Sequence, residues 1–227
     1  MSETTASRIS LRAAAILTAF SLLFTALMAT TYRATKPAID ASAEAEKLKL
    51  AGEVLPAGLY DNALLADYLE VMPRAELGLA AQDGPVRVMR ARKAGAPVAL
   101  VFEAVAPDGY GGKIRLILAV GADDRVIGVR VVGHKETPGL GDYIDPKKDR
   151  NKAAPWIRQF DATGFGRVAA ADWKVKKDGG RFDARTGATI SARAVTNAVR
   201  RALQFAIDQH EALYALPARS VLTKEGP

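Results

Sequence analysis

The chain contains no cysteine, only two histidines and few aromatic residues, which make up 7% of its 227 residues. The absence of cysteine excludes disulfides, iron–sulfur clusters and thiolate metal sites from this chain. The histidines, His134 and His210, lie far apart and have no companion ligand at metal-binding spacing, so no metal site is expected. Any redox chemistry would therefore depend on a bound cofactor.

Basic residues outnumber acidic ones, with 32 Lys and Arg against 25 Asp and Glu, and the formal net charge is +7. Such a balance suits nucleic acid or an anionic membrane as a partner. The basic residues are spread along the chain and form no recognised nucleic-acid motif, so nucleic acid is not expected as a partner. Hydrophobic residues make up 49% of the chain, which is enough for a packed core in one domain of ordinary size.

One long uncharged segment, residues 13–31, lies near the N-terminus. About 20 apolar residues span a bilayer as a helix. The segment is longer than the core of a signal peptide, which has roughly 7–15 residues, so a membrane helix over residues 13–32 is favoured over a cleaved signal. Charge alone does not set the orientation of this helix, because two basic residues flank each end: Arg8, Arg12, Arg33 and Lys36.

Beyond this helix the sequence predicts a helical connector over residues 33–82 and a compact α+β domain over residues 83–215. In the connector, residues 41–50 have a helical composition and residues 62–71 have apolar residues at helical spacing. In the domain, four runs with a period of two predict an antiparallel meander, joined by glycine-containing turns. These runs are residues 86–92, 97–105, 113–120 and 125–132.

Later elements are a short helix around residues 155–160, a strand around residues 168–176 and a long helix from Ser191 to about Tyr214. The long helix has apolar residues at helical spacing, which predict a stripe facing the core. Residues 1–12 are expected to precede the membrane helix on the cytoplasmic side, and residues 216–227 to form a C-terminal tail.

Two segments suggest chemistry. The loop His134–Asp142 contains glycines and a proline, which let a backbone pass close to a flat ligand, although a solvated turn has the same composition. The segment Thr186–Thr189 precedes the long helix, whose free N–H groups and dipole favour a phosphate. A simple helix N-cap is the alternative for this second segment. From the residues alone, both alternatives stay open.

Taken together, three segments resemble the FMN-binding domain found in the G subunit of the Rnf ion-translocating electron-transport complex. The C subunit of the sodium-translocating NADH:quinone oxidoreductase is a relative of this family. The resemblance covers about residue 10 to residue 210, and the short chain and the start of its long helix favour the Rnf branch. It rests on GYGGKI at residues 109–114, ETPGLG at residues 136–141, and the run from Asp183 to the TGAT of residues 186–189.

The resemblance implies a role for each motif residue. FMN would be joined by a phosphoester bond to the hydroxyl of Thr189, and Ser191 would bond the phosphate. Arg185 and Arg193 would offset its charge. A flavin transferase would recognise a signature that also includes Asp183, Thr186, Gly187 and Ala188. The isoalloxazine ring would be lined by Glu136, Thr137, Gly139, Leu140 and Gly141.

The resemblance further implies a single-pass flavoprotein in a bacterial inner membrane, with its main domain on the periplasmic side. Such a subunit relays electrons within an ion-translocating ferredoxin:NAD oxidoreductase and turns over no substrate of its own. Its implied partners are the other membrane and redox subunits, the flavin transferase and membrane lipid. Two alternatives remain: a tethered flavin-binding regulator or sensor, which should carry a signalling domain, and a non-redox structural subunit, which should lack a chromophore.

Overall fold

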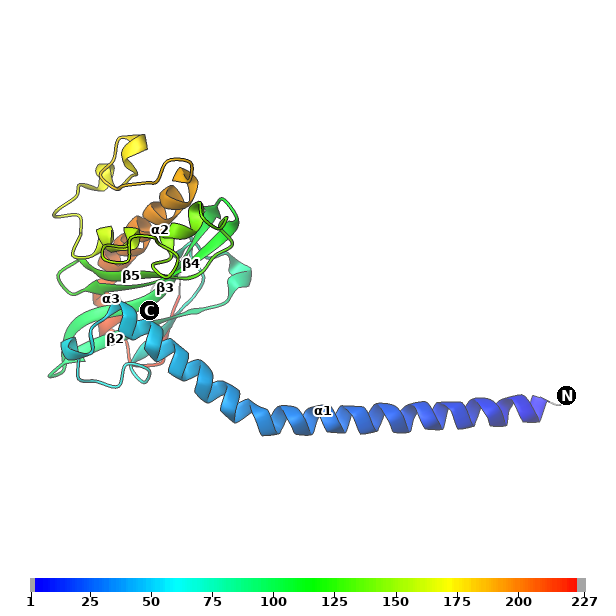
Figure 1. Ribbon diagram of the computed structural model, residues 1–227. Helices are drawn as coiled ribbons and strands as arrows, with labels where there is room; N and C mark the ends of the chain where they lie inside the picture. The colour runs from blue at the N-terminus through cyan, green and yellow to red at the C-terminus, as the bar shows by residue number, and fades with distance from the viewer. Residues whose placement is uncertain (1–2, 224–227) are drawn as a thin grey trace. The chain divides into compact units, whose positions relative to one another are not determined.

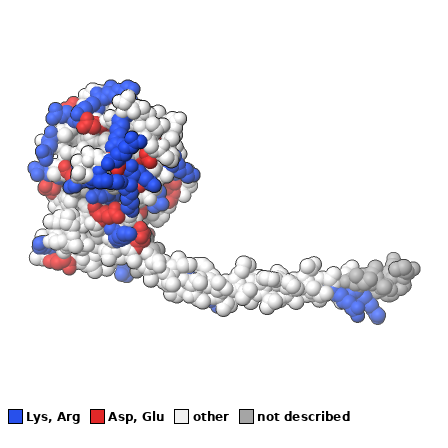
Figure 2. Space-filling model, viewed as in Figure 1, with Lys and Arg blue, Asp and Glu red and all other residues white. Residues whose placement is uncertain are grey.

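The computed structural model describes residues 3–223 and divides into two compact units between Glu46 and Lys47. The first unit consists of one helix, α1 (Glu3–Val54), whose last turns belong to the second unit. Within α1, the stretch Ser10–Ile39 is long and apolar enough to cross a membrane, and none of it is buried. Figure 2 shows this stretch as a long and largely uncharged surface. The predicted membrane helix, residues 13–32, lies inside it.

The second unit is built on one six-stranded sheet with the order β5-β4-β3-β2-β1-β6 (Figure 1). All neighbouring strands are antiparallel except β1 and β6, which are parallel. The strands are β1 (Tyr68–Val71), β2 (Val86–Lys93), β3 (Ala96–Gly109), β4 (Gly112–Gly121), β5 (Val126–Gly133) and β6 (Val221–Leu222). The predicted meander is therefore confirmed as β2 to β5.

Short turns set the pairing of the meander. Ala94 and Gly95 join β2 to β3 with φ angles of 49° and 80°, which is the left-handed backbone that tight hairpins need. The turn between β3 and β4 pairs Gly109 with Gly112 and projects Tyr110 into solvent. This second turn lies beside the motif loop that follows β5.

Helix α2 (Thr189–Asp208) covers one face of the sheet, as Figure 1 shows. Phe205 of α2 meets Phe102 of β3 edge to face, an arrangement that aromatic pairs favour, with ring centroids 5.7 Å apart. The opposite face holds a smaller apolar cluster in which the end of α1 packs on Val101 and Ile117. A Cβ at Gly128 would lie 2.8 Å from the Val54 carbonyl oxygen, so the sheet needs glycine where α1 ends.

Residues between β5 and α2 form short 3-10 helices over an aromatic cluster of Tyr143, Trp156, Phe160, Trp173 and Phe182. Both tryptophans are core residues. A short helix, α3 (His210–Ala215), follows α2. The 3-10 helices are η1 (Ala57–Leu59), η2 (Ala75–Leu77), η3 (Ala81–Asp83), η4 (Gly141–Ile144), η5 (Trp156–Phe160), η6 (Ala170–Asp172) and η7 (Lys176–Asp178).

Several element predictions were wrong. Residues 62–71 are not helical: they end in β1, where Leu69 and Val71 alternate into the core while pairing with β2. Residues 168–176 form 3-10 turns rather than a strand, with one isolated bridge between Val175 and Phe182. The long helix is interrupted at Gln209, and the tail supplies β6, which makes the sheet mixed. At β1 and β6, tertiary pairing overrides a short local pattern.

A partly buried ion-pair network joins β2 to the segment that follows α2. The carboxylate of Asp67 accepts hydrogen bonds from Nε of Arg90 at 2.6 Å and from Nε of Arg92 at 2.9 Å. Arg90, only 3% exposed, also donates to the carbonyl oxygens of Leu213 and Leu216. This arginine is therefore compensated by one carboxylate and by the end of α3.

We expect Asp67→Asn to lower the free energy of unfolding by about 3–5 kcal/mol, because it leaves the Arg90 charge buried without its counter-ion. Chemical denaturation followed by circular dichroism measures this loss. The control is Glu70→Gln, which removes an exposed carboxylate 3.9 Å from Arg87. This control should cost less than about 1 kcal/mol. Equal losses in the two variants would contradict the assigned role of Asp67.

Candidate functional site

Three segments that are far apart in the sequence enclose one cavity of about 260 Å³. They are the turn between β3 and β4, the loop that leads into η4, and the start of α2. The cavity is lined by Tyr110, Glu136, Thr137, Leu140, Gly141, Gly187, Ala188, Ile190 and Ser191. The structure thus brings together the three motif segments identified in the sequence.

Most of the predicted cofactor-binding residues line this cavity, while Gly139, Asp183, Thr186 and Thr189 do not. Tyr110 and Ile190 line it without having been predicted as ligands. Both had a signal in the sequence, because Tyr110 is a large residue between glycines and Ile190 follows the TGAT run directly. Whether each lining residue contacts a cofactor stays a prediction.

The floor of the cavity is a buried carboxyl group. Glu136 is 4% exposed; its Oε1 accepts the Gly111 N–H at 2.9 Å, and its Oε2 accepts the hydroxyl of Ser191. A Cβ at Gly141 would lie 2.5 Å from the Ser191 Oγ and 2.8 Å from the Glu136 Oε2, so a larger residue there would displace both groups. The motif loop therefore has an exposed tip at residues 137–140, while Glu136 and Gly141 are buried and tie it to the domain. The Ser191 hydroxyl is engaged by Glu136.

The rim of the cavity is apolar and exposed. Tyr110, Leu140 and Ile190 are 70%, 54% and 44% exposed, respectively. Large side chains that surround a cavity without covering one another are typical of a site for a flat apolar ligand. The arrangement combines an apolar rim with one carboxyl group at its floor.

The structure at the start of α2 decides whether residues 186–189 form a simple helix N-cap. Its N-cap is Ala188, and no side chain caps the first turn. Thr189 is half-buried at the first helical position, and its hydroxyl makes no hydrogen bond to any residue within the range 3–223. The segment Thr186–Thr189 is therefore no hydroxyl N-cap, and the free N–H groups of the first turn lie at the positive end of the dipole.

The arginines expected to offset a phosphate already have carboxylate partners. Arg185 pairs with Asp149, and Arg193 holds Asp178 through two hydrogen bonds of 2.5 and 2.8 Å. The Arg193 hydrogen bonds hold the pKa of Asp178 below its usual value. The field that acts on an anion at the start of α2 therefore comes mainly from the helix itself.

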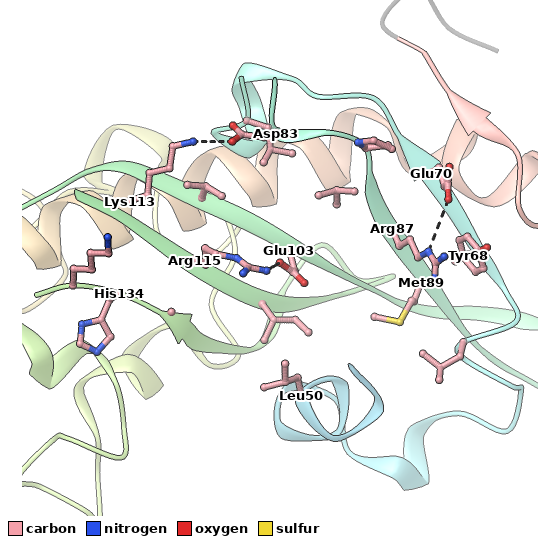
Figure 3. Close-up of a pocket in the computed structure, with 18 residues that line it drawn as sticks. Leu50, Tyr68, Glu70, Asp83, Arg87, Met89, Glu103, Lys113, Arg115 and His134 are labelled. Atoms are coloured by element: carbon pink, nitrogen blue, oxygen red, sulfur yellow. Dashed lines mark hydrogen bonds and ion pairs between the residues drawn. The ribbon is translucent and has the colours of Figure 1, made fainter. Parts of the chain in front are cut away.

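A larger groove of about 890 Å³ crosses the sheet face that carries the end of α1 (Figure 3). Its acidic side chains are paired: Asp83 with Lys113, Glu103 with Arg115, and Glu70 with Arg87. His134 lines this groove and not the cavity, and its Nδ1 accepts the Glu136 N–H at 3.1 Å. Because the groove contains none of the predicted cofactor residues, we assign the functional site to the smaller cavity.

Comparison with known proteins identifies the family of the chain. The family model for the FMN-binding domain matches residues 109–204, which include all three cavity segments, and the model for the RnfG N-terminal region matches residues 1–54. The chain is 39% identical to a Pseudoalteromonas atlantica protein that is named as the G subunit of an ion-translocating oxidoreductase complex, over 93% of this chain and 95% of the relative.

Relatives with the same name give similar values. A Pseudomonas aeruginosa protein is 41% identical over 90% of this chain and 92% of its own length. A Shewanella baltica protein is 37% identical over 89% of this chain and 92% of its own length. These similarities extend over both the N-terminal helix and the domain.

We expect Gly141→Ala to destabilise the domain by about 1–3 kcal/mol, because the new methyl group overlaps Ser191 and Glu136. The control is Gly166→Ala, where a Cβ would have no neighbour within 4 Å. That control should change stability by less than about 0.5 kcal/mol. Chemical denaturation of the two variants side by side tests the packing of the cavity floor, and a neutral Gly141→Ala would refute it.

Proposed function

Because this chain belongs to the family of G subunits of ion-translocating oxidoreductase complexes, we propose that it relays electrons between other redox subunits through FMN bound in the cavity. The observation that carries the proposal is the convergence of three motif segments on one cavity with an apolar rim and a carboxyl floor. Bound FMN supplies the redox chemistry that this cysteine-free chain lacks.

The cavity suits a partly exposed flavin. Its volume of about 260 Å³ lies just below the range of roughly 300–1,000 Å³ that is usual for small-molecule sites. A molecule as large as FMN would therefore leave part of its surface open between Tyr110, Leu140 and Ile190. Such exposure favours electron exchange with a neighbouring subunit over turnover of a free substrate.

A covalent bond from the FMN phosphate to Oγ1 of Thr189 is the second part of the proposal. Thr189 lies between two cavity-lining residues, Ala188 and Ile190, and its hydroxyl has no partner among the residues that the structure describes. The uncapped first turn of α2 favours the phosphate charge that remains after esterification. A flavin transferase would install the bond, with Asp183, Thr186, Gly187 and Ala188 as its recognition signature.

The third part concerns the membrane. We propose that Ser10–Ile39 anchors the chain in the inner membrane among lipid and the other subunits, and that the domain faces the periplasm. A covalent bond would keep the cofactor from being lost into that compartment. Each of these statements has a separate test.

Removing the Thr189 hydroxyl should abolish flavin attachment. Wild type and Thr189→Val are expressed with a flavin transferase and denatured, and the gel is inspected for flavin fluorescence; only the variant should be dark. Thr196→Val is the matched control, because it makes the same change in the same helix at a buried hydroxyl that lacks a hydrogen-bond partner in the described part of the chain. It should fluoresce like wild type.

Mass spectrometry of the peptide that contains residue 189 should show the FMN adduct in wild type and in Thr196→Val. An unmodified peptide in wild type would refute covalent attachment, and fluorescence that persists in Thr189→Val would move the bond to another residue. Purification from membranes with other redox subunits distinguishes a relay from a flavin-binding sensor, which would copurify with none of them.

The absence of cysteine allows a direct test of orientation. Lys148→Cys places one thiol on an exposed loop of the domain, and Arg8→Cys places one before the membrane stretch. In cells with a permeabilised outer membrane, an impermeant maleimide should label Lys148→Cys only. Labelling of Arg8→Cys instead would reverse the orientation and would leave the flavin proposal untouched.

A further inference from the structure

The segment that precedes α2, residues 183–188, is held in place by side chains from outside the cavity. At its start, the Asp183 N–H donates to Oε1 of Gln159 at 2.7 Å, and Nε1 of Trp156 donates to the Asp183 carbonyl oxygen at 2.7 Å. Both partners belong to η5. The backbone N–H and the backbone carbonyl oxygen of Asp183 are thus both hydrogen-bonded to side chains of η5.

Tyr143 of η4 holds the middle and the end of the segment. Its hydroxyl accepts the Arg185 N–H at 3.1 Å and donates to the Ala188 carbonyl oxygen at 3.3 Å. The guanidinium carbon of Arg185 also lies 4.6 Å from the centre of the Tyr143 ring, within the range of a cation–π contact. One buried tyrosine therefore joins two backbone positions of the same segment.

Asp149 fixes the side chain of Arg185. Asp149 is fully buried and accepts the N–H groups of Trp156 at 2.7 Å and Asn151 at 2.9 Å, in addition to its ion pair with Arg185. Burial alone would raise the pKa of Asp149, but these hydrogen bonds and the Arg185 charge together hold it below the usual value. The group is therefore a carboxylate at neutral pH and a firm anchor for the arginine.

Some residues of the segment are held by hydrogen bonds, and others are exposed to solvent. Asp183, Arg185 and Ala188 are bonded through the contacts above, while Thr186 and Gly187 are exposed. None of Tyr143, Asp149 and Arg185 lines the cavity. The contacts described above connect these three residues to the cavity through the backbone of the segment, which contains the lining residues Gly187 and Ala188.

We propose that Tyr143, Asp149 and Arg185, the anchoring triad, are positioning residues that keep the flavin ring in the cavity once FMN is joined to Thr189. This inference rests on the proposed function. The bond to Thr189 tethers one end of the cofactor, and the anchored segment fixes where that end lies relative to Leu140 and Tyr110. Without the triad the flavin stays attached, and its ring leaves the cavity more often.

The test compares Tyr143→Phe and Asp149→Asn with wild type, using the full chain in detergent after coexpression with a flavin transferase. Tyr214→Phe is the matched control, because it removes a buried tyrosine hydroxyl that has no hydrogen-bond partner among residues 3–223. Gel fluorescence measures attachment. Flavin anisotropy and quenching by iodide measure how freely the ring moves, at a temperature well below the unfolding transition seen by circular dichroism.

We expect equal gel fluorescence in all four proteins. In Tyr143→Phe and Asp149→Asn the share of flavin open to iodide should rise at least about fivefold, which is the factor for the loss of one typical hydrogen bond, and anisotropy should fall. Tyr214→Phe should match wild type in both measurements. If Asp149→Asn fails to fold, Tyr143→Phe, which removes one oxygen atom, carries the comparison.

Three results would overturn the inference, and they are distinguishable. Unchanged quenching and anisotropy in folded Tyr143→Phe would show that the triad does not position the ring. Loss of attachment in the variants alone would assign the triad to recognition by the transferase. Absence of flavin fluorescence in the wild-type protein would show that no flavin is attached, and this result would refute the proposed function as well.

Discussion

The carboxyl group of Glu136 is the contact on which the functional site depends. It joins the three segments of the cavity, since Glu136 belongs to the loop after β5, Gly111 to the turn after β3, and Ser191 to the first turns of α2. Each of these segments is a loop or a helix end, and Glu136 is the residue that hydrogen-bonds to both of the others. A buried carboxylate that lost either partner would be costly, so the three segments are stable mainly as one assembly. The cavity is a consequence of this joint arrangement.

Sequence reasoning predicted the strands of the meander well, because β2 to β5 are long and alternate clearly between apolar and polar residues. It failed at β1 and β6, which are short and gain their stability from pairing with each other and with β2. A strand of two residues, Val221–Leu222, leaves no periodic signal. In the aromatic segment between residues 141 and 182, the short helix predicted around residues 155–160 is present as η5, whereas the strand predicted around residues 168–176 was wrong. The order of this segment comes from buried ring contacts and 3-10 turns rather than from a repeating backbone pattern.

The site was predicted through its motifs and not through its contacts. The glycine loop, the TGAT run and the GYGGKI turn could each be found in the chain, but nothing in their spacing shows that Glu136 receives the Ser191 hydroxyl. Likewise, Arg185 and Arg193 looked free to meet a phosphate, whereas the fold pairs them with Asp149 and Asp178. Those two carboxylates lie 36 and 15 residues away along the chain. Pairings over such separations depend on the tertiary structure, which local patterns do not encode.

The engagement of both arginines has a consequence for how the chain would hold an anion. A guanidinium group placed on the phosphate would bind it strongly, yet it would also compete with a transferase that must reach the threonine. Here the charge is supplied by the open first turn of α2, whose N–H groups are fixed by the helix and need no side chain to reorganise. Arg185 instead helps to hold residues 183–188 in place through its contacts with Asp149 and Tyr143, which lie outside the cavity. With FMN attached to Thr189 as proposed, the fold would separate three tasks. The helix end would attract the phosphate, the exposed Thr186 and Gly187 would leave access to the threonine, and buried groups outside the cavity would keep the backbone between them in place.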